Sequence, residues 1–149
     1  MKILVVCTAN ICRSPMGERV LARLLAETSA RVSSAGTRAI NGNAADTTVA
    51  ELIHERGWGD LADHRSQSLL PSVVQRAELV LCMEHEHVRH ILAMDPTLQG
   101  RVRRFGHWQG CDIADPIGQS RARYAACLDE IEAAANTWKD KLKQMGLIV

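Results

Sequence analysis

A cysteine and an arginine near the amino terminus have the residue types and the spacing for chemistry on a phosphate group. Cys7 and Arg13 lie six positions apart. A cysteine thiolate is a strong nucleophile, and a guanidinium can bind two phosphate oxygens at once, which a lysine ammonium cannot. The pair therefore indicates attack of a sulfur on phosphorus, with the arginine holding the phosphate.

The segment between these two residues lies where a strand passes into a helix. Lys2–Val6 is a short apolar run typical of a buried parallel strand, and a helical pattern of apolar residues starts at Ser14. We expect Ser14 to be the helix N-cap and Pro15 to lie in the first turn. Backbone N–H groups of such a loop, with the helix N-terminus, form an anion site that also favours a thiolate at Cys7. The expected phosphate-binding residues are Thr8, Ala9, Asn10, Ile11, Cys12 and Arg13. The alternative is an inert core cysteine at the end of a strand.

Further strands and helices alternate along the chain. Strands are predicted at Arg31–Ser34, Glu78–Cys82 and Arg101–Phe105, and helices at Asp46–Arg56 and Glu84–Met94. Asp46 is the expected N-cap of its helix. A closing helix from about Ser120 carries one apolar stripe, formed by Tyr124, Leu128, Ile131, Ala135, Trp138, Leu142 and Met145. This order predicts a single α/β domain, residues 1–149, with four parallel strands and helices on both faces of the sheet.

A leaving oxygen needs a proton donor, and two Asp-Pro pairs could supply a carboxylic acid. Asp95 precedes the last strand, at the amino edge of the sheet, and a residue before proline is a natural helix terminator. Asp115 follows that strand, so its loop leaves the carboxyl edge beside Cys7. Asp115 is therefore the predicted acid, with Asp112 as a weaker rival.

The composition fits an ordinary globular protein. Apolar residues make up 46% and charged residues 23%, and 18 basic residues balance 17 acidic ones. We expect no affinity for nucleic acid and no insertion into a membrane, because no apolar run approaches the roughly 20 residues that a spanning helix needs. The apolar run at the start is too short for a signal peptide, so a cytoplasmic location is expected.

Metal and disulfide chemistry find little support in the sequence. The five cysteines contain no C-x-x-C pair, so one of them can be present for its reactivity. His85, His87 and His90 lack the H-E-x-x-H spacing, and a solvated helix face explains them better than a metal site does. We expect neither a metal nor a cofactor.

The segment Val6 to Pro15 resembles the signature of the low-molecular-weight protein tyrosine phosphatases. The similarity continues through Ser34-Ala35-Gly36, His64, Leu81-Cys82-Met83 and Asp115-Pro116. The stretch Phe105-Gly106-His107-Trp108 is similar to the bacterial branch paired with exopolysaccharide tyrosine autokinases. The resemblance implies four parallel strands flanked by helices, a metal-independent reaction and a cysteinyl-phosphate intermediate.

The resemblance also implies roles for individual residues. Cys7 would be the nucleophile, Arg13 the phosphate clamp and Asp115 the general acid. Ser14 would donate a hydrogen bond to the thiolate, while Asn10, supported by Ser34 and His64, would hold the shape of the loop. Simpler roles remain open for those three, as turn residues or as a solvated histidine. Cys12 would be the partner of Cys7 in a reversible disulfide, or else a small buried residue.

Two positions depart from the family pattern. Ala9 stands where the family usually has glycine, and would be strained if the backbone there had a positive φ. Ile117 stands where relatives often have a tyrosine that forms one wall of the substrate cleft. Ile40 could form the opposite wall or simply pack under a loop. An apolar slot of this kind suits a phenyl ring.

Three other functions compete with tyrosine phosphatase activity. Arsenate reduction on the same fold needs resolving cysteines near Cys82, but Arg89 stands seven residues on. Arginine phosphatases resemble this chain too, and favour threonine where it has Ile11. A non-catalytic phosphoprotein-binding module would need neither nucleophile nor acid. The resemblance implies a tyrosine-phosphorylated protein as partner, with a membrane tyrosine autokinase as the expected example, and a monomer is the default expectation.

Overall fold

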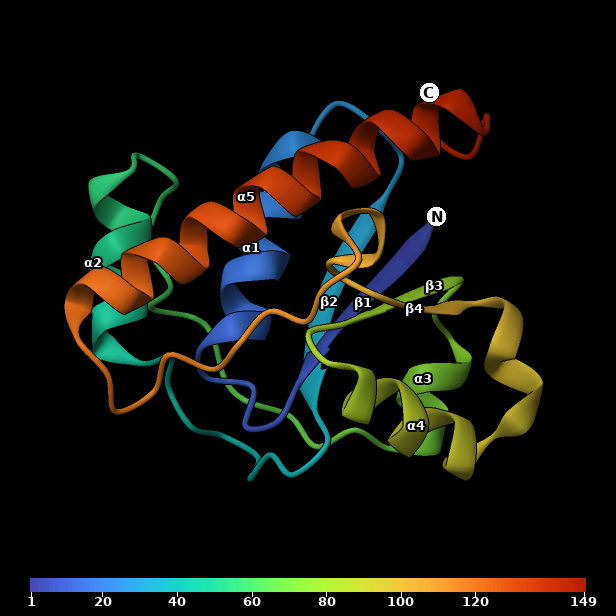
Figure 1. Ribbon diagram of the computed structural model, residues 1–149, viewed down its shortest axis with the longest axis horizontal. Coiled ribbons are helices and arrows are strands. Elements are labelled where there is room, and N and C mark those ends of the chain that lie inside the picture. Colours follow the sequence, from blue (N-terminus) through green and yellow to red (C-terminus); the bar gives the residue numbers. More distant parts are fainter.

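Four short strands form the centre of the molecule, and the computed structural model describes all residues 1–149 (Figure 1). The strands are β1 (Lys2–Cys7), β2 (Arg31–Gly36), β3 (Leu79–Cys82) and β4 (Val102–Arg104). All are parallel, in the order β2-β1-β3-β4. The predicted α/β fold with four parallel strands is confirmed, with strand ends that differ from the prediction by one or two residues.

Helices cover both faces of the sheet, as predicted (Figure 1). One face carries α1 (Arg13–Leu24), α2 (Thr47–Glu55) and the long α5 (Arg121–Gln144). The other carries α3 (Pro71–Gln75) and α4 (His85–Met94). No helix is both long enough and apolar enough to cross a membrane.

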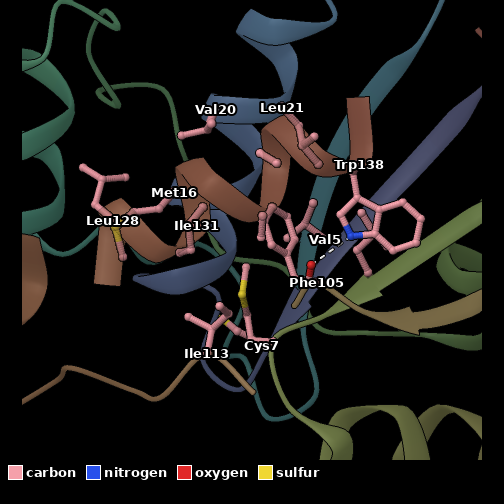
Figure 2. Close-up of a cluster of buried hydrophobic side chains, with 14 of the residues drawn as sticks. Val5, Cys7, Met16, Val20, Leu21, Phe105, Ile113, Leu128, Ile131 and Trp138 are labelled. Carbon is pink, nitrogen blue, oxygen red and sulfur yellow. Dashed lines mark hydrogen bonds between the residues drawn. The ribbon is translucent and has the colours of Figure 1, made fainter. Parts of the chain in front are cut away.

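The central strand β1 is apolar along its length because both of its faces are covered. Ile3 and Val5 point into the cluster under α1 and α5, whereas Leu4 and Val6 point into the cluster under α3 and α4. Cys7 belongs to the first cluster, and Figure 2 shows it at the end of that cluster, near Ile113. The strand thus anchors the cysteine at the carboxyl edge of the sheet.

An indole in the core joins the last helix to the segment after β4. Trp138 on α5 donates a hydrogen bond from Nε1 to the backbone oxygen of Phe105, at 2.8 Å (Figure 2). The Phe105 ring is fully buried against β1 and α1. This contact fixes the start of the loop that leads to Asp115.

The helix ends follow the sequence in two places and depart from it in one. Asp46 caps α2 by accepting hydrogen bonds from two backbone N–H groups, as predicted. The closing helix α5 begins after Ser120, close to the predicted start, and the Ser120 side chain accepts a hydrogen bond from the backbone N–H of Arg123. The prediction that Ser14 is the N-cap of α1 is wrong. The helix begins at Arg13 with Cys12 as its N-cap and no side-chain capping bond. Ser14 is therefore inside the first turn, and its hydroxyl contacts Cys7 and Asn10 instead of capping the helix.

Short elements were missed by the sequence patterns. Helix α3 and the 3₁₀ turns η1 (Pro96–Gly100) and η2 (His107–Gln109) span at most five residues each, too few to show a periodicity. Met145 was placed on the apolar stripe of α5, but it lies just after the helix and is 52% exposed.

Truncation of Phe105 tests the role of this ring in the core. We expect Phe105→Ala to lower the free energy of unfolding by about 3–5 kcal/mol, because it leaves a cavity under α1. Urea denaturation monitored by circular dichroism measures this change. The control Leu70→Ala, at a residue that is 53% exposed, should cost less than about 1 kcal/mol. Equal losses for both variants would contradict this description of the core.

Candidate active site

The loop after β1 is held in place by the exit of the neighbouring strand β2. The backbone N–H of Thr37 donates to the carbonyl of Cys7 at 3.0 Å, and that of Arg38 donates to the carbonyl of Thr8 at 2.9 Å. Gly36 precedes them and has room for no side chain. A Cβ there would collide with the carbonyl oxygen of Thr8 and lie 3.0 Å from the nitrogen of Asn10. The two backbones therefore pack directly against each other.

Asn10 is the residue that shapes this loop. It is fully buried and has a φ of 58°, a left-handed conformation that asparagine adopts more readily than most residues. Its backbone oxygen lies 2.7 Å from Nε2 of His64, and its Oδ1 accepts a hydrogen bond from the backbone N–H of Gln67 at 2.9 Å. Ala9 does not have a positive φ, so the strain anticipated at that position does not arise.

The amide of Asn10 orients the hydroxyl groups around it. Because Oδ1 accepts from Gln67, Nδ2 can only donate, and it donates to Ser14 Oγ at 2.7 Å and to Ser34 Oγ at 2.9 Å. Ser34 in turn donates its own proton to Glu18, at 2.5 Å. The hydroxyl proton of Ser14 is thereby left for another acceptor.

That acceptor is the sulfur of Cys7. Ser14 Oγ lies 2.9 Å from Cys7 Sγ, and the backbone N–H of Asn10 donates to the same sulfur at 3.3 Å. The side chain of Cys7 is buried at the start of the loop. Two hydrogen-bonding groups thus converge on one sulfur, an arrangement that suits a cysteine nucleophile.

Arg13 brings a buried positive charge to the same place. Its Nη1 donates to Glu84 Oε2 at 2.5 Å and to the backbone oxygen of Ile113 at 2.7 Å. Burial alone would lower the pKa of the guanidinium, but the hydrogen bond to Glu84 and the nearby Cys7 raise it above its usual value. Arg13 is thus a fixed cation.

Asp115 lies near the second terminal nitrogen of Arg13, Nη2, whereas Glu84 binds Nη1. Its Oδ2 is 3.7 Å from Arg13 Nη2, and the side chain remains 44% exposed. Oδ1 accepts a hydrogen bond from the backbone N–H of Ile117. The rival Asp112 is turned away, since its Oδ1 accepts from Arg104 Nη1 at 3.1 Å and from the backbone N–H of His85 at 3.0 Å. Of the two carboxylates, Asp115 is the one that faces the arginine.

His87 joins the loop from the side of α4. The prediction that all three histidines of this helix are solvated is wrong for His87, which is only 3% exposed. Its Nδ1 accepts from the backbone N–H of Glu84 at 3.0 Å, so Nε2 carries the proton and donates to Thr8 Oγ1 at 2.9 Å. Burial, and then the charge of Arg13, lower the pKa of His87. The ring is therefore held neutral.

The remaining predicted residues lie around this centre. Cys12 is buried, and burial raises the pKa of its thiol, while none of the five cysteines forms a disulfide. Ile40 and Ile117 are 73% and 43% exposed on their loops. Hydrogen bonds join five of the predicted residues, Cys7, Asn10, Ser14, Ser34 and His64. Arg13 and Asp115 form an ion pair of their own at the same edge of the sheet.

Sequence reasoning assigned no role in the site to four residues that contact it. Gln67, Glu84, His87 and Gly36 contact the loop or its arginine across long sequence separations. The capping pair formed by Glu84 and His87, three positions apart at the start of α4, was the one local signal available. Gln67 lies in an irregular segment that carries no pattern.

The comparisons with known proteins agree with this geometry. Residues 2–146 match the family model of low molecular weight phosphotyrosine protein phosphatases. The chain belongs to this family. A putative low molecular weight protein-tyrosine-phosphatase of Klebsiella pneumoniae is 40% identical over 142 residues, which cover 95% of this chain and 96% of that protein. The molecule is therefore a phosphatase, and the resemblance seen in its sequence is confirmed.

Solved structures of related phosphatases share the fold. Wzb of Vibrio vulnificus, in complex with benzylphosphonate, superposes with a TM-score of 0.87 at 38% identity and covers 95% of this chain and 98% of its own. The YwlE arginine phosphatase of Geobacillus stearothermophilus has a TM-score of 0.90 at 31% identity, covering 98% and 95%. The fold alone does not separate these two activities.

Substitution of Gly36 tests the direct contact between β2 and the loop. Gly36→Ala must displace the carbonyl of Thr8, so we expect kcat/KM for para-nitrophenyl phosphate to fall at least tenfold. Gly100→Ala is the matched control, because a Cβ at Gly100 meets nothing within 4 Å. Full activity of Gly36→Ala would show that the loop shifts at no cost to catalysis.

Acid should weaken the contact between α4 and the loop. The folded protein holds His87 neutral, so the unfolded chain binds more protons between the ordinary histidine pKa of 6.5 and the lower folded one. Stability should accordingly fall as the pH drops below about 6.5. Urea unfolding of the wild type and His87→Gln at pH 7.5 and 5.0 measures this. The variant should lose less stability on acidification than the wild type, while the exposed control His85→Gln should behave like the wild type.

Proposed function

We propose that this phosphatase hydrolyses phosphotyrosine in proteins through a cysteinyl-phosphate on Cys7. The observation that carries the proposal is the sulfur itself. It accepts hydrogen bonds from Ser14 and from the backbone of Asn10, at the N-terminus of a helix that carries the buried cation Arg13. This arrangement combines an activated nucleophile with an anion site.

In the first step the Cys7 thiolate attacks phosphorus in line with the bond to the tyrosine oxygen. The S–P bond forms as the P–O bond breaks, and the electron pair of that bond stays on the phenolic oxygen. Asp115, entering the step as a carboxylic acid, gives its proton to that oxygen. Its partial exposure and its place beside Arg13 suit a group that must meet the substrate.

In the second step water releases the phosphate. The Asp115 carboxylate removes a proton from the water as its oxygen attacks phosphorus. The new P–O bond forms, the S–P bond breaks, and the electron pair returns to the Cys7 sulfur. Ser14 stabilises the thiolate leaving group with its hydroxyl proton. Inorganic phosphate then leaves, and the enzyme is ready for another turnover.

Arg13 and the loop N–H groups stabilise the charge on the transferred group. Phosphoryl transfer spreads negative charge over three oxygens, so fixed donors lower the barrier most effectively. Glu84 and the carbonyl of Ile113 hold the guanidinium in place before substrate arrives. Little reorganisation is then needed during the reaction.

The choice of phosphotyrosine rests on the apolar residues around the loop. Ile40 and Ile117 are exposed large apolar side chains, which suit the faces of a phenyl ring. Ile11 stands where arginine phosphatases favour threonine. The related Wzb structure contains benzylphosphonate, an aromatic phosphonate. Arginine phosphatase activity is the second candidate, supported by the likeness to YwlE.

A tyrosine autokinase of exopolysaccharide production is the proposed protein substrate, and the cytoplasm the proposed location. Support comes from the similarity to Wzb phosphatases and from the Phe105–Trp108 stretch. Cys12 is the proposed disulfide partner of Cys7 under oxidising conditions. In the reduced enzyme it stays a thiol, because burial raises its pKa.

Two substitutions test the mechanism. Cys7→Ser should abolish turnover of para-nitrophenyl phosphate, since a serine hydroxyl lacks the nucleophilicity of the thiolate. Asp115→Ala should lower kcat by a factor of about 10² or more, as expected for loss of a general acid. The loss should be larger for phenyl phosphate, whose leaving group is more basic, than for para-nitrophenyl phosphate. Asp112→Ala serves as the control and should change kcat little.

Substrate class is tested with three parallel assays on the wild type. The chain should cleave phosphotyrosine peptide, cleave phosphoarginine peptide poorly, and fail to reduce arsenate in the presence of thioredoxin. Preference for phosphoarginine would replace the proposed substrate but keep the mechanism. Normal turnover by Cys7→Ser would refute the mechanism itself.

A further inference from the structure

A groove lies on the sheet away from the phosphate loop, between the amino-terminal halves of β1 and β2 and helix α3. Its volume is about 290 Å³. We name it the cationic groove, defined by Lys2, Leu4, Arg31, Ser33, Gln67 and Arg76. The β1–β2 register pairs Lys2 with Arg31 and Leu4 with Ser33, so these side chains share one face of the sheet. Helix α3 is too short to cover that face.

The lining of the groove is positively charged and carries no carboxylate. Lys2, Arg31 and Arg76 are exposed, and none of them forms an ion pair. Glu78, next to the groove residue Ala77, is not part of the lining and accepts a hydrogen bond from the backbone N–H of Lys2 at 3.1 Å. Since the chain as a whole has a net charge of only +1, three unpaired cations around one hollow are a local excess.

The groove borders an open sheet edge. On its outer side β2 is bridged only at Gly36, with Ser68, and Gln67 Nε2 donates to the carbonyl of Ser34 at 2.8 Å. The edge from Arg31 to Ser33 is left open. An open edge accepts an extended chain through its backbone groups, while side chains of that chain select the partner.

We propose that the cationic groove binds an acidic, extended segment of a partner protein. Carboxylates on one side of the extended segment pair with Lys2, Arg31 and Arg76, while its alternate side chains point away from the groove. The segment lies along the outer edge of β2. This proposal does not rest on the catalytic mechanism, because the groove is at the opposite end of β1 from Cys7.

Gln67 contacts both the cationic groove and the phosphate loop, so the two sites are neighbours that do not overlap. It lines the groove, and its backbone N–H supports Asn10. A segment bound in the groove leaves the phosphate loop accessible. The groove therefore acts as a docking site that holds a partner protein while the active site stays open to a phosphorylated residue.

A fluorescein-labelled peptide of four Glu-Val repeats tests the proposal by fluorescence anisotropy with the full chain. The alternation favours an extended conformation and places the carboxylates on one side. We expect saturable binding that weakens as salt rises from about 20 to 200 mM, because exposed charges are screened. A matched peptide of four Lys-Val repeats should not bind.

Paired variants locate the binding site. Ser33→Glu adds a negative charge to the groove and should raise the Kd at least tenfold, whereas Ser33→Lys at the same position should lower it. The double variant Arg31→Glu/Arg76→Glu should also raise the Kd for the peptide at least tenfold. Its control, Arg23→Glu/Lys143→Glu, reverses two exposed cations on α1 and α5 and should change the Kd less than twofold. All four proteins should retain wild-type kcat/KM for para-nitrophenyl phosphate, which also shows that they fold.

Three outcomes would overturn the proposal. The first is absence of saturable binding of the acidic peptide at low salt. The second is an equal loss of binding in the control double variant, which would indicate non-specific attraction. The third is displacement of the peptide by millimolar inorganic phosphate or vanadate, which would place it in the phosphate loop. None of these results bears on the Cys7 mechanism, whose failure shows in the turnover assays instead.

Discussion

The site depends on one hydrogen bond, from the hydroxyl of Ser14 to the sulfur of Cys7. Its direction is set elsewhere: Gln67 fixes the amide of Asn10, and that amide donates to Ser14 and leaves the hydroxyl proton free for the sulfur. The Asn10 amide nitrogen can only donate, and a Ser14 hydroxyl that accepts from it still has its own proton to donate to a thiolate. Residues from α1, β2 and an irregular loop are thus needed to orient a single proton.

A second set of contacts holds the loop from the opposite side. Glu84 and His87 form the capping box at the start of α4, and both also contact the site. Glu84 binds Arg13, and His87 binds Thr8. The ion pair with Glu84 offsets the cost of removing the Arg13 guanidinium from water. The nucleophile and the phosphate clamp are therefore stabilised by different elements.

The sequence predicts much of this because its strongest signals are local. The strands and the cap at Asp46 are read from short patterns, and the order of the strands places Cys7 and Asp115 at one edge of the sheet. Ser14 was assigned to the wrong position because a serine before a helix usually caps it, whereas here the sulfur needs its hydroxyl. The prediction of a solvated His87 rests on the polar residues beside it in the sequence, whereas its contact with Thr8 spans 79 positions. Such long-range contacts leave no trace in one sequence.

The missing side chain at Gly36 has a wider consequence for how the enzyme meets its substrate. The backbone of Gly36 packs directly against the phosphate loop, and the next two residues donate hydrogen bonds to the carbonyls of Cys7 and Thr8, so the protein's own backbone sets the shape of that loop. Capture of a phosphorylated side chain should then be governed by encounter and desolvation, and the scaffold has already met the entropic cost during folding.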